Sequence, residues 1–213
     1  MKNSGYLILL LALGLVFVSY KWRSSSQADP AAAVSNATIE DIMTRTSVRA
    51  YSDRSVDSMT IDTLLHAAMA APSAGNKQPW RFVVITDKSR LKYIGENFRT
   101  MKMATGAATA VVMCGDVNAT FPGEGREYWV QDVSAASENL LLAAHALGLG
   151  AVWCGIYPQT ERVDKFSEML GLPDSIVPMA CICIGYPAGQ QTPKDKWNPE
   201  NIRYNTWEAT GLR

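Results

Sequence analysis

Apolar runs and stretches of helical spacing alternate along the chain from residue 38 onward. Short runs that are apolar almost throughout predict strands of a covered sheet. Apolar side chains that recur every three or four residues predict helices between them. The predicted strands are 81–86, 109–114, 151–158 (which ends in a turn) and 179–185, and the predicted helices are 38–43, 61–69, 88–104, 133–147 and 159–170.

Before this region lies an uninterrupted apolar run, residues 6–18, which follows the basic Lys2. Such a run is typical of an export signal or a short membrane anchor, and the aromatic and basic side chains at 20–23 resemble an interfacial flank. No small-x-small cleavage site directly follows the run, which favours an uncleaved anchor. Residues 1–23 are therefore predicted to export the chain or to anchor it in a membrane. Positive charge is similar on both sides of the run, so its orientation stays open.

Residues 24–35 have the composition of a linker, and the folded domain is predicted at 36–213. The chain carries 20 basic and 20 acidic side chains, so its charge gives no support for a nucleic-acid partner. Its two histidines do not belong to a metal-ligand spacing, and no metal site is predicted. The cysteines all lie in apolar runs and are predicted to be buried free thiols: Cys114, Cys154, Cys181 and Cys183.

The stretch 70–80 joins a predicted helix to a predicted strand and mixes small, amide-bearing and aromatic residues. Small residues allow the backbone to approach a ligand closely, and Ser73, Asn76 and Gln78 both donate and accept hydrogen bonds. This chemistry suits a planar heteroaromatic ligand with carbonyl and imide edges, such as a flavin. The alternative is a helix-to-strand turn whose polar residues are incidental.

A second candidate site lies at 45–51, where Arg45 and Arg49 flank Ser47. Two guanidinium groups and a hydroxyl form a good set for gripping a phosphate, although surface arginines are also common without any ligand. The chain contains neither a Gly-x-Gly-x-x-Gly loop nor a Gly-Lys-Ser/Thr loop. Dinucleotide folds built on the first loop and nucleotidases built on the second are both disfavoured.

Four stretches in this order resemble the FMN-dependent nitroreductase family. They are 45–51, 71–80, 132–155 and 184–187, and a basic, aromatic tail follows the last. The resemblance covers residues 38–207, nearly all of the predicted folded part. It implies an α+β fold, a three-layer sandwich in which helices flank a central mixed sheet, working as an intertwined homodimer.

Two FMN molecules are then expected at the subunit interface, each contacted by both chains. The resemblance places Arg45, Ser47 and Arg49 at the phosphate and ribityl chain, and either Lys194 or Lys196 completes the phosphate site. It places these residues at the isoalloxazine ring: Pro72, Ser73, Asn76, Gln78, Cys154, Gly155 and Ile156. Pro72 and Ser73 are expected to reach the flavin of the other subunit.

The expected activity is NAD(P)H-linked and of ping-pong type, passing hydride through flavin N5 to a nitroaromatic, a quinone or a similar small acceptor. The flavin carries this chemistry, so no catalytic side chain is predicted. Residues 121–129 are the candidate lid over the substrate, with an ordinary loop as the alternative. A second hypothesis is a membrane-tethered electron-relay module, or an FMN-using relative that does not reduce nitro groups.

Overall fold

The computed structural model describes residues 30–207. Helix α2 (Pro30–Thr44) begins inside the predicted linker, because three alanines follow a proline at the first helical position, and both features favour helix. Contacts divide the chain after Met43, and the unit that begins at Thr44 carries the sheet. Among residues 30–207, no helix is both long and apolar enough to cross a bilayer. The predicted signal or anchor at 1–23 lies outside the described residues.

A four-stranded sheet forms the middle of the unit, in the order β1-β2-β4-β3. Each pair of neighbouring strands is antiparallel. A mixed sheet was expected, but its named strands are all antiparallel. Within residues 30–207, the parallel pairing is limited to one bridge between Ser47 and Ala151. The strands are β1 (Trp80–Ile85), β2 (Thr109–Asp116), β3 (Gly150–Gly155) and β4 (Ile176–Gly185).

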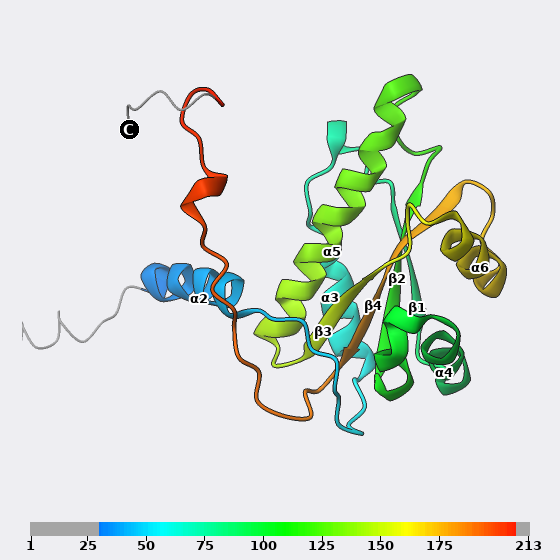
Figure 1. Ribbon diagram of the computed structural model, residues 1–213, viewed down its shortest axis with the longest axis horizontal. Helices are drawn as coiled ribbons and strands as arrows, with labels where there is room; N and C mark the ends of the chain where they lie inside the picture. The colour runs from blue at the N-terminus through cyan, green and yellow to red at the C-terminus, as the bar shows by residue number, and fades with distance from the viewer. Residues whose placement is uncertain (1–29, 208–213) are drawn as a thin grey trace, which may run out of the picture. The chain divides into compact units, whose positions relative to one another are not determined.

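Helices cover both faces of this sheet, as the sandwich expectation requires (Figure 1). Strand β4 shows why its sequence is apolar throughout: Ile182 and Ile184 pack on one side, and Cys181 and Cys183 pack on the other. All four cysteines are free and buried, which confirms that prediction. One face carries α3 (Ser58–Met69) and α5 (Tyr128–Ala146), and the other carries α4 (Lys88–Asn97), α6 (Thr160–Leu170) and the 3-10 segment η2 (Arg99–Gly106).

Local hydrogen bonds set the ends of several helices. The Asp57 carboxylate accepts from the backbone N–H of Thr60 at the start of α3 (2.8 Å), and Asp87 does the same for Arg90 in α4 (2.9 Å). Helix α4 ends at Phe98, whose extended backbone interrupts the helix predicted at 88–104. The reason is tertiary: Phe98 is buried against Phe166, with ring centroids 4.6 Å apart.

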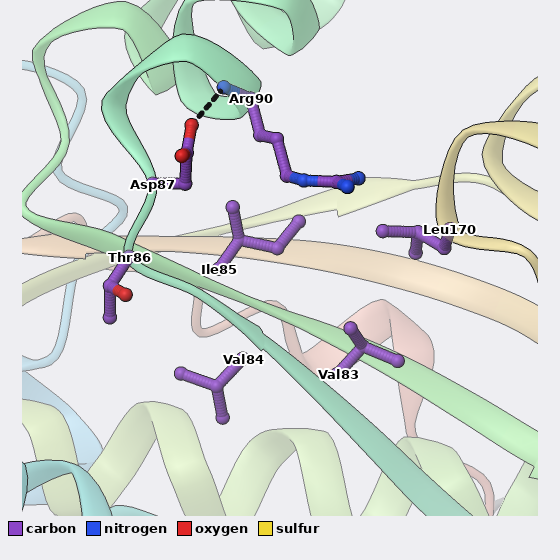
Figure 2. A pocket seen from close by; sticks show the side chains of 7 residues that line it. All are labelled: Val83, Val84, Ile85, Thr86, Asp87, Arg90 and Leu170. Carbon is purple, nitrogen blue, oxygen red and sulfur yellow. Dashed lines mark hydrogen bonds between the residues drawn. The ribbon is translucent and has the colours of Figure 1, made fainter.

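Strand β1 lies at an edge of the sheet and pairs on one side only. Figure 2 shows its end, where Val84 points away from Val83 and Ile85. Val84 is 36% exposed, and a shallow pocket here is closed on its far side by Leu170 of α6. An open strand edge with exposed apolar side chains is a ready place for another chain to pair.

Candidate functional site

The turn between α3 and β1 has an unusual backbone. It contains the 3-10 segment η1 (Ala74–Asn76), and Gly75, Asn76 and Gln78 all have φ near the left-handed region, at 54°, 54° and 49°. Side chains other than glycine adopt this conformation at a cost, so surrounding contacts must hold it. Such turns cluster at sites where backbone or side chains meet a ligand.

The side-chain amides of this turn are paired with each other. Gln78 Nε2 donates to Asn76 Oδ1 at 2.8 Å, and the Gln78 backbone N–H donates to Ser73 Oγ at 3.0 Å. Within the described residues, this leaves the Asn76 amide N–H groups and the Gln78 side-chain carbonyl available at the surface. A donor and an acceptor therefore lie side by side, as the imide edge of a heteroaromatic ring requires.

The predicted lid packs directly against this turn. A Cβ atom on Gly75 would come within 2.6 Å of Phe121 Cζ, so only glycine leaves room for the ring. The Lys77 ammonium lies 5.1 Å from the centroid of the same ring, within cation–π range. Trp129, the last residue of the predicted lid, is instead buried at the start of α5 and belongs to the core.

The predicted phosphate-binding residues lie beside the start of β3. Ser47 forms the parallel bridge to Ala151, and the N–H of Val48 donates to the Ala151 carbonyl at 3.0 Å. Val48 is buried, whereas its neighbours Ser47 and Arg49 are exposed. Arg45 is already engaged, because its Nε lies 3.1 Å from Glu138 Oε1 of α5.

Gly155, the last residue of β3, has free space beside it. The Ala151 and Gly155 carbonyls accept from Val48 N–H and from Arg162 Nη1 (2.8 Å), both outside the sheet. Because peptide groups alternate in direction along a strand, the N–H groups of Trp153 and Gly155 point to this free edge as well. A Cβ at Gly155 would meet nothing within 4 Å, and its φ is not positive, so neither packing nor backbone geometry within this chain requires glycine there.

The neighbours of Gly155 are enclosed. Cys154 is 5% exposed, and Ile156 is fully buried, with its N–H bonded to Met179 and its carbonyl bonded to the N–H of Gln159. A hydrogen bond with Cys183 and burial raise the pKa of Cys154 and outweigh the opposing charges of nearby arginines. The thiol therefore stays neutral and is not a thiolate nucleophile.

The two halves of the candidate site lie at the same end of the sheet but on opposite edges. Strand register places the start of β1, the end of β2, the start of β4 and the end of β3 at one level. Three strand spacings separate β1 from β3, which is about 14 Å. The turn at 73–78 and Gly155 of one chain therefore do not close around a single small ligand.

Comparison with known proteins identifies the family of the chain. The model of the family described as "Nitroreductase family" matches residues 42–102 and 95–186. A protein of Archaeoglobus fulgidus, provisionally named NADH dehydrogenase/NAD(P)H nitroreductase, is 44% identical over 170 residues, covering 78% of this chain and 96% of the relative. The chain belongs to the nitroreductase family.

Solved structures of family members show the same fold. A provisionally named NADH dehydrogenase/NAD(P)H nitroreductase from Parabacteroides distasonis is 42% identical, with a TM-score of 0.76 over 80% of this chain and 98% of that one. A provisionally named nitroreductase from Desulfovibrio desulfuricans, solved in complex with FMN, is 30% identical, with a TM-score of 0.68 over 80% and 98% of the two chains.

Against the nitroreductase motifs, the structure gathers Ser47, Arg49 and Gly155 along β3 and keeps the residues from Pro72 to Gln78 together in one turn. Lys194 and Lys196 are exposed on the segment that follows β4. The contacts that sequence reasoning missed include Arg162 on the Gly155 carbonyl and Phe121 on Gly75. Neither belongs to a sequence motif: Phe121 lies 46 residues beyond Gly75, and Arg162 reaches back from α6 over seven residues to Gly155.

Proposed function

We propose that this chain is an FMN-dependent oxidoreductase that takes hydride from NAD(P)H and passes reducing equivalents to a small acceptor. The observation that carries the proposal is Gly155: an outward-facing N–H beside open space, on the outer edge of β3 four residues beyond the bridge at Ala151. The family's FMN-bound member and its relatives named FMN reductase and NADPH-flavin oxidoreductase support the cofactor and the reductant. Bound FMN supplies the redox chemistry, and the chain binds and orients it.

The residues fit a ligand with a phosphate at one end and a ring at the other. Ser47 and Arg49 lie beside Ala151, and Gly155 follows four residues later along the strand, a separation of about 13 Å at the rise of a β-strand. Arg49 binds the phosphate: its guanidinium donates to the Ser47 carbonyl at 3.5 Å and has no carboxylate partner among the described residues, whereas Glu138 shares the charge of Arg45. A lysine of the C-terminal segment, Lys194 or Lys196, adds the remaining charge.

The turn at 73–78 serves the flavin of a second copy of the chain. The Asn76 and Gln78 amides offer a donor and an acceptor, but they lie across the sheet from Gly155 of their own chain. A homodimer in which Pro72 and Ser73 cross to the partner's flavin brings both halves together. Cofactor binding and dimerisation are then linked.

An intertwined dimer also accounts for exposed surface. Trp197 and Trp207 of the C-terminal segment are 74% and 80% exposed in the single chain, and the outer edge of β1 is unpaired (Figure 2). Large aromatic side chains at this level of exposure are typical of interaction surfaces. The segment 193–207 therefore docks on the partner subunit as an arm.

The acceptor binds beneath the loop that starts at Phe121. This ring packs on Gly75 of the cofactor-lining turn, so the loop forms one wall of the pocket in which a flat acceptor replaces the nicotinamide. Sequential occupation of one pocket gives ping-pong kinetics. A nitroaromatic and a quinone are suitable acceptors, because both are flat and accept electrons from a reduced flavin.

An anaerobic absorbance titration of the purified full-length chain tests this function. We expect bound flavin bands that bleach on addition of NADPH or NADH and recover on addition of a quinone. Flavin that is present and stays oxidised favours the relay hypothesis, in which a membrane partner supplies electrons. A chain without flavin even after reconstitution with FMN contradicts the proposal.

A further inference from the structure

Asp132 of α5 is a buried carboxylate that contacts the cofactor-lining turn from behind. Its side chain is 5% exposed, and its Oδ1 accepts the backbone N–H of Ala74 at 2.8 Å. Ala74 is the first residue of η1, whose preceding residue, Ser73, supplies no side-chain cap. Asp132 therefore caps a turn that lies 58 residues away in the sequence.

The second oxygen of this carboxylate is unusual. Among the side-chain nitrogen and oxygen atoms of the described residues, Asp132 Oδ2 is the buried one without a hydrogen-bond partner. A buried oxygen that has lost water and gained no donor costs free energy, so such an atom calls for a functional explanation. A carboxylate accepts hydrogen bonds at both oxygens, and here Oδ2 can still accept one.

A matching donor lies next to the occupied one. Ser73 Oγ accepts the backbone N–H of Gln78 at 3.0 Å, and among the described residues no acceptor takes the Ser73 hydroxyl hydrogen. Ser73 directly precedes Ala74, so its hydroxyl and the Ala74 N–H are neighbouring donors. If the Asp132 carboxylate accepts from both donors, it holds two adjacent residues of the turn, Ser73 and Ala74.

We infer that Asp132 is a positioning residue for the cofactor, an inference that rests on the proposed function. It holds the turn by Ala74 N–H, as the structure shows, and takes the Ser73 hydroxyl as its second donor when the turn closes on the flavin. The two bonds fix the left-handed backbone from Gly75 to Gln78. That backbone in turn aims the two amides at the ring.

Four variants of the full-length chain test this inference: Asp132→Ala, Asp132→Asn, Ser73→Ala and the double variant Asp132→Asn/Ser73→Ala. The readouts are the Kd of FMN from fluorescence quenching, the visible circular dichroism of bound FMN and amide exchange at Ala74 in the apoprotein. Ser137→Ala is the matched control, because Ser137 is equally buried on α5 and its hydroxyl donates only to the carbonyl of Val133.

We expect Asp132→Ala to raise the Kd of FMN about tenfold or more, since hydrogen bonds to a charged group are the stronger ones, and to speed exchange at Ala74. Asp132→Asn keeps an oxygen for Ala74 but cannot accept from Ser73. Its effect is therefore smaller, with altered flavin dichroism and ordinary exchange at Ala74. The double variant is expected to match the weaker-binding single variant, because both substitutions remove the same bond.

Three results overturn the inference. One is a Kd for Asp132→Asn equal to that of the Ser137→Ala control. Another is multiplicative effects in the double variant, which show that Ser73 acts on the flavin independently of Asp132. The third is a wild-type chain that binds no FMN, which overturns the proposed function as well and is thereby distinguished from the first two. If Asp132→Ala does not fold, the Asp132→Asn comparison still decides.

Discussion

The edge of β3 and the turn at 73–78 contribute to the same candidate site in opposite ways. The β3 edge is part of the sheet: its side chains up to Cys154 are buried or half-buried, and its outward peptide groups are fixed by the ladder to β4. The turn is exposed, has three left-handed residues in four positions and is held by a few contacts from α5 and the Phe121 loop. The comparison indicates a preformed half and an adjustable half.

Preformed and adjustable halves respond differently to substitution. A change at the β3 edge alters binding while the fold stays intact, because the sheet holds the backbone in place. A change in the turn alters the backbone itself, so stability and binding change together.

The largest effect is expected from Gly155→Val. Its side chain occupies the open space beside the free edge of β3, and about 3 kcal/mol of steric conflict with the flavin raises the Kd of FMN about a hundredfold. The thermal midpoint of the apoprotein stays close to wild type, because a Cβ there meets no protein atom. Gly106→Val is the control, since Gly106 also borders open space. Equal FMN binding by both variants contradicts the placement of the ring.

Arg49→Gln comes next, with a Kd for FMN raised about thirtyfold, because a charge-assisted hydrogen bond to phosphate contributes about 2 kcal/mol. Arg45→Gln is expected to have a smaller effect, because Glu138 already pairs with Arg45 at 3.1 Å. Riboflavin, which lacks the phosphate, should bind both variants like wild type. A loss of riboflavin binding in Arg49→Gln means that the residue acts on the ring or the fold instead.

In the adjustable half, Gly75→Ala should lower the free energy of unfolding by about 1–2 kcal/mol. A methyl group is strained at φ 54° and lies 2.6 Å from Phe121 Cζ. Chemical denaturation measures the loss. Adding Phe121→Leu removes the steric part and restores part of the stability, while the KM for a quinone acceptor rises because the pocket wall is altered. No recovery in the double variant shows that the two segments do not press on each other.

The last prediction concerns pH and Cys114, which is buried on β2. Burial raises the pKa of Cys114 from 9.0 to about 12, so the native state keeps a proton that the unfolded chain releases. The stability due to this group is complete below pH 9 and is lost as pH rises from about 9 toward 12. Denaturation curves at several pH values should show this loss, and Cys114→Ala should flatten it. An unchanged slope in the variant assigns the loss to other groups.

Much of the fold was predictable because burial on both faces leaves an apolar run in the sequence. The strand at 109–114 was predicted within two residues of its observed ends for that reason, and the stretch 151–158, predicted as a strand leading to a turn, contains all of β3 except Gly150. The break at Phe98 was not predictable, since helical spacing continues through it and the cause is a ring on α6. The single parallel bridge at Ser47 likewise depends on how distant segments meet.

The candidate site divides in the same way. Residues such as Asn76 and Gln78 were predicted from their chemistry, because amides and small residues gather in one stretch of sequence. Asp132 and Arg162 were not assigned a role, because their partners lie 58 and 7 residues away and their own surroundings are ordinary helix. The involvement of Glu138 with Arg45 also had no sequence pattern.

The separation of the two halves on opposite edges of the sheet has a genetic consequence. Consider one chain that carries Gly155→Val and another that carries a defective turn, each inactive as its own homodimer. When the two are expressed together, a mixed dimer of the proposed kind pairs the intact β3 edge of one with the intact turn of the other at one of its two sites. Two defective alleles thereby restore half of the sites in each mixed dimer, a complementation that a site built within a single chain cannot give.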